Sequence, residues 1–254
     1  MKLSAATFVL RPRGVLEVLD LALRAVDRDR AAYRRLALVT LLPSLALCVA
    51  LRLSSVAPWI VWVLALGLGG LWEAAFTTVS GELMFEPRVL VRRGLGQFAR
   101  RLHWHLVGRG LALVLMAVVT LVLLTPLVGG QLLFVSEVVQ LERANGFAAL
   151  WRTSKMTRLG ARIVTWLWLW VARLSFVAVF VLLGLACGQE LLQLIPPEQE
   201  QLAAELLALV GWFGSVPFVA VARFLAYIDG RTRQEGWDLQ LRFAAIAARA
   251  GTPP

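Results

Sequence analysis

The sequence has little of several residue types on which catalytic or metal chemistry depends. It contains only two cysteines, Cys48 and Cys187, and two histidines, His103 and His105. Two cysteines do not make a disulfide framework, and two histidines without further ligands do not make a zinc site. No glycine-rich phosphate loop, Ser/His/Asp set or Cys/His pair is evident. We therefore predict a protein that is not an enzyme and that uses no metal or other cofactor.

Acidic residues are also scarce, with 16 Asp and Glu against 26 Lys and Arg, so the net charge is +10. The arginines flank apolar runs and do not form the single patch expected of a nucleic-acid-binding surface. Hydrophobic residues make up 59% of the chain, above the roughly 45–50% of soluble domains. These features predict a membrane protein whose basic segments meet anionic lipid on the cytoplasmic side, with no nucleic-acid partner.

Six apolar stretches have about the length that a transmembrane helix needs, roughly 20 residues. No signal peptide precedes them, since 1–35 is rich in basic residues, and we expect no leader to be removed. The fourth stretch is short, and 125–130 would form a tight turn before it. One bent helix in place of the third and fourth stretches is the alternative, which gives five spans. The predicted spans are 36–53, 59–83, 106–125, 127–141, 163–187 and 202–228.

Charge favours six spans over five. With six, the segments 1–35, 81–110, 136–162 and 228–254 share one side of the membrane and hold every Lys and Arg except Arg52, Arg173 and Arg223. Such segments stay in the cytoplasm. Five spans would place the last basic segment outside. The sequence therefore predicts a multi-pass membrane protein with both termini in the cytoplasm.

The basic segments also carry apolar residues at helical spacing, which predicts amphipathic helices lying at the membrane surface. The predicted fold is thus all-α in a single membrane domain. It comprises an N-terminal cytoplasmic helix in 1–35, a six-span bundle of three hairpins in 36–228 and a C-terminal cytoplasmic helix in 229–254. The residues expected to contact lipid headgroups are Arg92, Arg93, Arg100, Arg101, Arg152, Lys155 and Arg158.

Two charged residues fall near the middle of predicted spans, Glu73 in the second and Arg173 in the fifth. A lone charge in hydrocarbon costs from about 3 to more than 10 kcal/mol. We expect the two to form an ion pair between helices; a wet cavity for a substrate is the alternative. Near the inner boundary, we expect a second polar cluster in which Arg223 pairs with Glu137 or Glu82. This inner-boundary cluster comprises Glu82, Glu137, Arg223 and Asp229.

Two segments, 136–154 and 226–241, carry a family resemblance. The first contains Glu142-Arg143 and then Ala149-Leu150, although Thr153-Ser154 departs from the family pattern. The second matches a Tyr-x-Asp-x-Arg-x-Arg-x-Glu-Gly-x-Asp pattern at Tyr227, Asp229, Arg231, Arg233, Glu235, Gly236 and Asp238. Together they resemble poorly characterised bacterial six-helix membrane proteins, among them the membrane domain fused to some glycerophosphodiester phosphodiesterases. The resemblance implies a module of the bacterial inner membrane that lacks the catalytic barrel of the phosphodiesterases. Its relatives look like accessory subunits beside ATPases or transglutaminase-like proteins.

These observations lead to two functional hypotheses. The first is a non-enzymatic scaffold or anchor in a larger membrane complex, which contacts lipid and other protein subunits. Its predicted partner surface comprises Arg231, Arg233, Glu235 and Asp238, and a self-satisfied belt of salt bridges is the alternative role of these residues. The second hypothesis is a small transporter or lipid-handling protein with a cavity around Glu73 and Arg173.

Overall fold

A computed structural model of the chain describes residues 14–84, 91–119, 125–142, 144–156, 159–191 and 196–235. Within these ranges, the side chains at 108–119, 125, 127–128, 131, 190–191, 197 and 234–235 are not described. The described residues form helices and turns and include no strand. The predicted all-α fold class is therefore confirmed.

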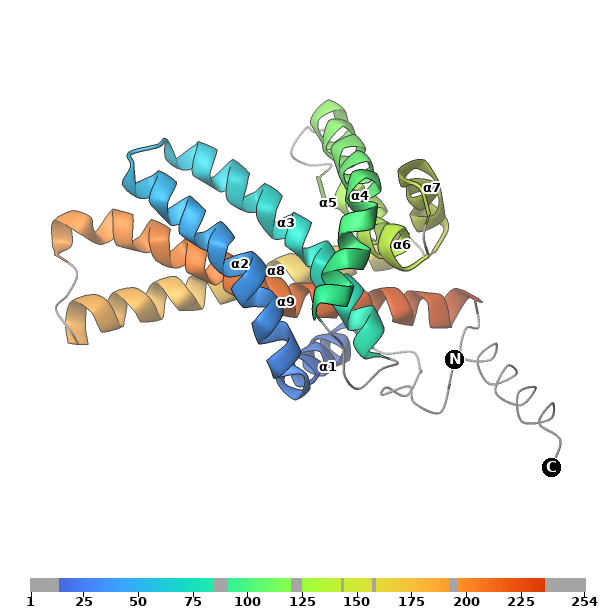
Figure 1. Cartoon of the computed structure of the whole chain (residues 1–254), viewed down its shortest axis with the longest axis horizontal. Helices are drawn as coiled ribbons and strands as arrows, with labels where there is room; N and C mark the ends of the chain where they lie inside the picture. Colours follow the sequence, from blue (N-terminus) through green and yellow to red (C-terminus); the bar gives the residue numbers. More distant parts are fainter. Residues whose placement is uncertain are drawn as a thin grey trace.

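Four helices are long and apolar enough to cross a membrane. They form two hairpins, α2 (Arg30–Leu53) with α3 (Pro58–Leu83), and α8 (Leu159–Leu185) with α9 (Glu200–Glu235). Ser55 lies in the turn that follows α2 and has a φ of 63°. Pro58 stands at the first position of α3, where its fixed φ suits a helix start. Both hairpins turn at the same end of the molecule, on the left in Figure 1. We call this the hairpin end.

The two helices of the second hairpin differ in how they are packed. Helix α9 contacts α8, α3, α1 and α2. In its most apolar stretch of 18 residues, 56% of the residues are buried. The corresponding figure for α8 is 11%, because α8 packs on α9 and α5 and leaves the rest of its surface uncovered. Its exposed side chains include Leu174, Leu182 and Leu183. Helix α9 is therefore the central helix of the bundle, and α8 lies at its edge.

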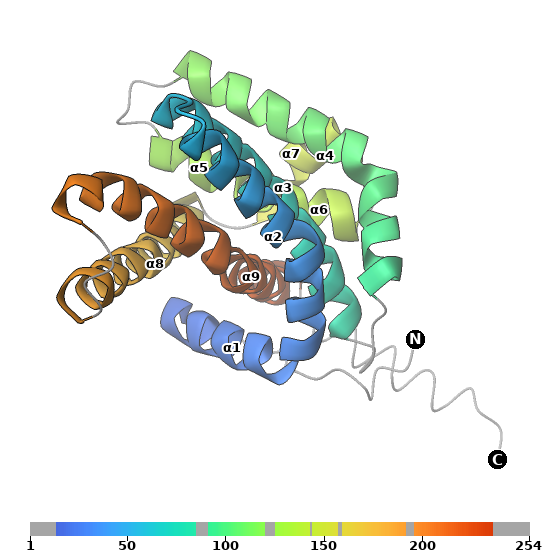
Figure 2. The ribbon, with the colours of Figure 1, turned by 60° about the vertical axis from the view of Figure 1, so that its left-hand side comes forward.

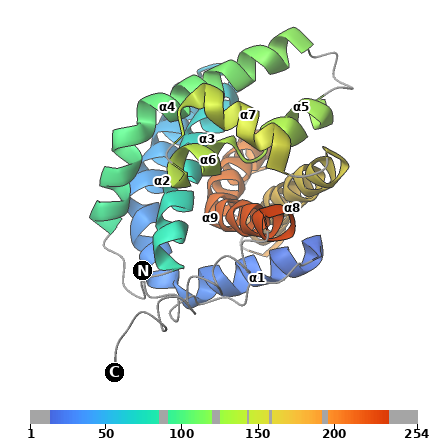
Figure 3. The same cartoon turned by 90° about the vertical axis from the view of Figure 1, so that its right-hand side faces the viewer.

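The remaining α-helices lie away from the hairpin end in Figure 1. They are α1 (Val15–Arg28), α4 (Val91–Val119), α5 (Thr125–Leu132), α6 (Val135–Leu141) and α7 (Gly146–Met156). Figure 2 shows α1 and α4 on opposite sides of the bundle. Helix α1 buries Val18, Ala22 and Ala25 and packs along α9. Figure 3 shows α9 between α1 on one side and α4, α6 and α7 on the other. The short helices α6 and α7 therefore lie close to the part of α9 that carries the polar residues described below.

The structure differs from the predicted third and fourth spans. Of the third, 106–125, residues 106–119 form the second half of α4, which runs without a break from Val91. Residues 120–124 and the side chains of 108–119 lie outside the described part of the chain. The fourth, 127–141, is divided into α5 and α6 at Leu133 and Phe134. Pro126 lies in the first turn of α5, where a missing N–H costs nothing, so 125–130 is helical and does not form the predicted turn.

Helix boundaries also differ from the predicted division of the chain. Helix α2 already begins at Arg30, within the segment expected to be a separate cytoplasmic helix, and α1 ends at Arg28. Helix α9 passes 228–229 without interruption and continues to Glu235. Apolar composition marks where a chain can enter lipid, whereas a helix continues as long as its backbone hydrogen bonds do. The hydropathy boundary is therefore not a helix boundary here.

Candidate functional site

Four charged side chains meet where α3, α6, α8 and α9 come together. Glu73 comes from α3, Glu137 from α6, Arg173 from α8 and Arg223 from α9. Their side chains are 0–10% exposed, so all four are buried. Two carboxylates and two guanidinium groups give no net formal charge. We refer to these four residues as the central network.

Glu73 bridges the two arginines of the central network. Its Oε1 accepts a hydrogen bond from Nη2 of Arg173, and its Oε2 lies 2.7 Å from Nη1 of Arg223. Arg223 also donates through Nε to Oε1 of Glu137, at 2.5 Å. The four charges therefore form one chain, Arg173–Glu73–Arg223–Glu137, in which each neighbour has the opposite sign.

Aromatic and hydroxyl groups surround Arg173 at one end of this chain. Its guanidinium carbon lies 4.3 Å from the ring centroid of Trp212, a cation–π arrangement. Its Nε donates to Oγ of Ser215 at 3.2 Å. The indole of Trp212 is held in turn by donating to the carbonyl oxygen of Ala65 at 3.1 Å. Arg173 is thus held by Trp212 and Ser215 of α9 as well as by Glu73 of α3.

Thr77 lies at the other end, one turn after Glu73 on α3. Its Oγ1 is 3.0 Å from the Glu73 carbonyl oxygen and 3.4 Å from Oε1 of Glu137. Among the described residues, Oε2 of Glu137 and Nη2 of Arg223 have no hydrogen-bond partner, although both atoms are buried. Buried polar atoms without a partner are uncommon in proteins. The Glu137 end of the central network therefore retains unused hydrogen-bonding capacity.

The arrangement suits helix fixation better than bond-making chemistry. No Ser, Cys or His nucleophile belongs to the central network, and its charges neutralise one another. Removing one partner from a buried ion pair leaves an uncompensated charge, which costs several kcal/mol. The central network therefore makes the relative positions of α3, α6, α8 and α9 mutually dependent.

The structure contains the predicted Glu73–Arg173 ion pair and also pairs Arg223 with Glu137, one of its two expected partners. The predicted inner-boundary cluster is divided. Glu82 accepts from Nε2 of Gln97 at 2.5 Å, and Asp229 accepts from Nε of Arg233 at 2.7 Å. Arg223 lies on the side of α9 that faces Glu73, so it joins the central pair. The sequence did not predict this contact between Arg223 and Glu73. Position along an apolar stretch shows how near its end a residue lies, but not which way its side chain faces around the helix.

The two segments that carry the family resemblance meet at Glu142. Its Oε1 accepts a hydrogen bond from the hydroxyl of Tyr227 at 2.7 Å and lies 3.4 Å from Nη1 of Arg231. Its Oε2 forms an ion pair with Nε of Arg152. We refer to Glu142, Arg152, Tyr227 and Arg231 as the Glu142 cluster. Arg223, Tyr227 and Arg231 follow one another at four-residue intervals on α9, so the central network and the Glu142 cluster lie along one face of that helix.

The predicted partner surface is only partly described. Arg231 belongs to the Glu142 cluster, where 19% of its side chain is exposed. Arg233 is more exposed and pairs with Asp229 one turn earlier on α9. The Glu235 side chain and all of Asp238 lie outside the described residues. Two of the four residues therefore take part in intramolecular ion pairs, as the salt-bridge alternative expects.

The predicted lipid contacts fall into two groups. Arg92, Arg93, Arg100 and Lys155 are exposed. Arg101 instead donates to the carbonyl oxygens of Val139 and Gln140, at 3.0 and 3.2 Å, and so caps the end of α6. Arg152 is half-buried against Glu142, and Arg158 lies outside the described residues. Only the first group has the exposure that a headgroup contact needs.

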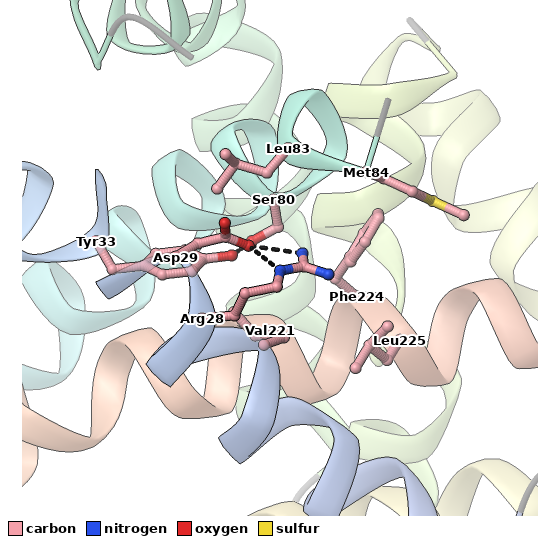
Figure 4. A pocket seen from close by; sticks show the side chains of 10 residues that line it. Arg28, Asp29, Tyr33, Ser80, Leu83, Met84, Val221, Phe224 and Leu225 are labelled. Atoms are coloured by element: carbon pink, nitrogen blue, oxygen red, sulfur yellow. Dashed lines mark hydrogen bonds and ion pairs between the residues drawn. The ribbon is translucent and has the colours of Figure 1, made fainter. Parts of the chain in front are cut away.

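A small recess lies where the corner between α1 and α2 meets the end of α3 and the middle of α9 (Figure 4). Arg28 pairs with Asp29 at 2.6 Å beside it, and the Tyr33 hydroxyl is 3.0 Å from Oγ of Ser80. Its cavity volume is about 10 Å³, which is room for about one water molecule. None of the central-network residues lines it, and it is too small for an organic substrate.

Comparisons of the chain with protein-family models, with curated proteins and with solved structures found no match. The resemblance to the membrane domain of glycerophosphodiester phosphodiesterases therefore stays a prediction.

Proposed function

We propose that this chain is a non-enzymatic, multi-pass subunit of the bacterial inner membrane, which acts as a scaffold or anchor for other proteins. The central network supports the proposal, because its charges are committed to one another across four helices. Such a network holds helices in place and leaves the outer helix faces for lipid and partners. In this proposal α4 and the α5–α6 pair complete six crossings with α2, α3, α8 and α9.

The distribution of charge supports an orientation with both termini in the cytoplasm. Exposed arginines, among them Arg34, Arg35 and Arg92, lie near the starts of α2 and α4. Both helices begin away from the hairpin end in Figure 1. At the hairpin end Arg52 is paired with Glu205, so its charge is compensated within the bundle. Since Lys and Arg residues near the ends of membrane spans favour the cytoplasmic side, the end that carries α1 and α7 is the cytoplasmic end in this proposal.

The direct test is purification of the tagged protein from its native membrane in a gentle detergent, followed by mass spectrometry of everything that co-elutes. We expect a protein partner in fixed stoichiometry. An untagged strain treated identically controls for carry-over. A protein that elutes alone with one specific lipid or small molecule would contradict the scaffold and favour transport.

A second candidate function, a small transporter or lipid-handling protein, is favoured by one observation. The unpartnered Oε2 of Glu137 could accept a proton or a hydrogen bond from a substrate, and the unpartnered Nη2 of Arg223 could donate a hydrogen bond to one. The double substitution Glu73→Gln with Arg173→Gln separates the two candidates, because two neutral amides can still hydrogen-bond. A scaffold variant of this kind should keep its partner in the same purification. A transporter variant should fold, as judged by gel filtration, and lose its bound substrate.

A further inference from the structure

Helix α7 places its two large aromatic rings on the outside of the molecule. Phe147 and Trp151 are 66% and 67% exposed, and they lie one turn apart on the same face. The opposite face is buried through Ala149, Thr153 and Met156. An amphipathic helix of a soluble protein buries its large apolar residues. Helix α7 does the reverse, with small and medium side chains inward and aromatic rings outward.

Three contacts hold α7 in this rotation. The side chain of Asn145 caps the helix by accepting from the backbone N–H of Ala148 at 2.8 Å. Arg152 is tied to Glu142, and Arg162 from α8 donates to the carbonyl oxygen of Thr153. Rotating the rings inward would break the last two contacts and expose buried polar groups. The outward rings are therefore a fixed feature of the fold.

Basic charge accompanies the exposed rings. Helix α7 contains Arg152 and Lys155 and no acidic residue. The ammonium group of Lys155 lies 4.3 Å from the ring centroid of Trp151. A long basic side chain that lies along an aromatic ring and extends its charge beyond it is the arrangement found at the headgroup level of membranes. We call Phe147, Trp151 and Lys155, the exposed members of this set, the aromatic–basic face.

We propose that the aromatic–basic face of α7 is a membrane-surface anchor, in which Phe147 and Trp151 enter the interface between headgroups and acyl chains and Lys155 contacts anionic headgroups. This inference rests on the proposed function, since it assumes that the bundle lies in a membrane. It adds a contact with lipid that is made by α7, which is not one of the four helices apolar enough to cross a membrane. The same contact would fix the depth of α7 and, through Glu142, that of α9.

The size of the face favours lipid over a protein partner. A fully buried aromatic side chain contributes about 150–250 Å², so two rings offer at most about 500 Å². A stable protein interface needs about 800 Å² from each partner. A membrane interface has no such minimum, because every ring that enters it is stabilised separately.

The test uses a fluorescent probe next to the rings. Cys48→Ala and Cys187→Ser remove the two native thiols, and Ala148→Cys places a polarity-sensitive dye on the exposed side of α7 with both rings intact. Leu174→Cys on α8 gives a reference for lipid contact, and Glu198→Cys beyond α8 gives one for water. The labelled full-length chains are reconstituted in phosphatidylcholine vesicles, with or without an equal part of phosphatidylglycerol. Quenching by spin-labelled lipid and by aqueous iodide is then compared.

We expect the dye at position 148 to be quenched by spin-labelled lipid severalfold more than the dye at 198. Replacing both Phe147 and Trp151 by Ser should abolish this difference. Trp59→Ser is the matched control, because Trp59 is 68% exposed but lies in α3 at the hairpin end; it should leave the signal at 148 unchanged.

Phosphatidylglycerol should reduce iodide quenching at position 148, and Lys155→Gln should remove that effect. Arg24→Gln, which alters an exposed basic residue of α1, should retain it. A dye at 148 that behaves like the dye at 198 in every vesicle, while the dye at 174 is quenched by lipid, would overturn the anchor but leave the membrane proposal standing. If spin-labelled lipid does not quench the dye at 174 either, both the anchor and the membrane proposal are overturned.

Discussion

The central network and the Glu142 cluster both contain carboxylate–guanidinium contacts, but they differ in how deeply the side chains are buried. In the central network, Glu73 and Glu137 have side chains 4% and 0% exposed. In the Glu142 cluster, Glu142 is 15% exposed and Arg152 is 42% exposed. Both groups join α6 to α9, and each contains carboxylate–guanidinium contacts. The comparison therefore isolates the effect of burial on ion pairs that otherwise resemble each other.

Burial determines what each group contributes. An unpaired charge in the central network has no water to solvate it, so loss of a partner leaves the full desolvation cost. Arg152 at the edge of the Glu142 cluster can turn to water, and pairs of this kind contribute only about 0–1 kcal/mol. The central network thus makes the fold intolerant of single changes, whereas the Glu142 cluster adjusts the position of α7 at little cost.

The largest expected effect is that of Glu73→Gln. The substitution leaves two buried guanidinium groups with one carboxylate, so we expect a loss of about 3–5 kcal/mol in the free energy of unfolding. Reversible unfolding in mixed detergent micelles measures the change. Glu142→Gln is the control and should lose about 1 kcal/mol. Equal losses in the two variants would refute the distinction between the central network and the Glu142 cluster.

Gly69→Ala tests whether Trp212, which is not part of the central network, holds Arg173 in place. A Cβ atom at Gly69 would lie 2.6 Å from Nε1 of Trp212, whose ring stacks on Arg173. We expect a loss of about 1–3 kcal/mol from overpacking. At Gly67, two positions earlier on α3, a Cβ meets nothing within 4 Å. Gly67→Ala should therefore be neutral or should stabilise α3 by up to about 1 kcal/mol, and a similar loss at both positions would contradict this packing.

Tyr227→Phe has an intermediate expected effect, because it deletes one hydrogen bond to Glu142. We expect a loss of about 1 kcal/mol in the same unfolding measurement. Tyr33→Phe is the matched control, since Tyr33 is equally buried but its hydroxyl contacts the neutral Ser80. Hydrogen bonds to charged groups are about twice as strong as neutral ones. Tyr33→Phe should therefore lose less free energy of unfolding than Tyr227→Phe. A larger loss in Tyr33→Phe would mean that Glu142 does not accept the Tyr227 hydrogen bond as a carboxylate.

Arg233→Ala should have the smallest effect on stability. Its ion pair with Asp229 is an exposed pair within one helix, and such pairs contribute about 0.3–0.5 kcal/mol. If Arg233 contacts a partner, the variant should stay folded and lose the co-eluting protein. Arg24→Ala breaks a comparable exposed pair on α1 and should keep that protein. Retention of the partner by both variants would remove Arg233 from the partner surface.

Much of the fold could be predicted from the sequence. Long apolar runs predicted α2, α3, α8 and α9 as helices able to cross a membrane, because hydropathy is a local property of the chain. A charge in the middle of an apolar run must find a partner, so Glu73 and Arg173 could be paired from sequence alone. The fourth predicted span was the shortest of the six stretches, and it is the one that the structure divides into two helices.

The rest depended on contacts between distant segments. That Glu73 also binds Arg223 requires a particular rotation of α9 against α3, which apolar residues on every side of α9 do not specify. Trp212 and Ser215, which hold Arg173, carried no signal beyond their presence in an apolar helix. The segments 136–154 and 226–241 were recognised separately, but nothing in either indicated that Glu142 would receive the Tyr227 hydroxyl.

The sequence by itself determined the helical class, the apolar stretches suited to a membrane and the need for buried charges to pair, because each follows from residues close together in the chain. The tertiary structure decided which charges share a partner and which way α7 faces. Those outcomes depend on the rotation and depth of whole helices, and these are set by the packing of many side chains at once. The aromatic–basic face shows the difference, since the sequence supplied Phe147 and Trp151 but only the packing of Ala149 and Thr153 turned them outward.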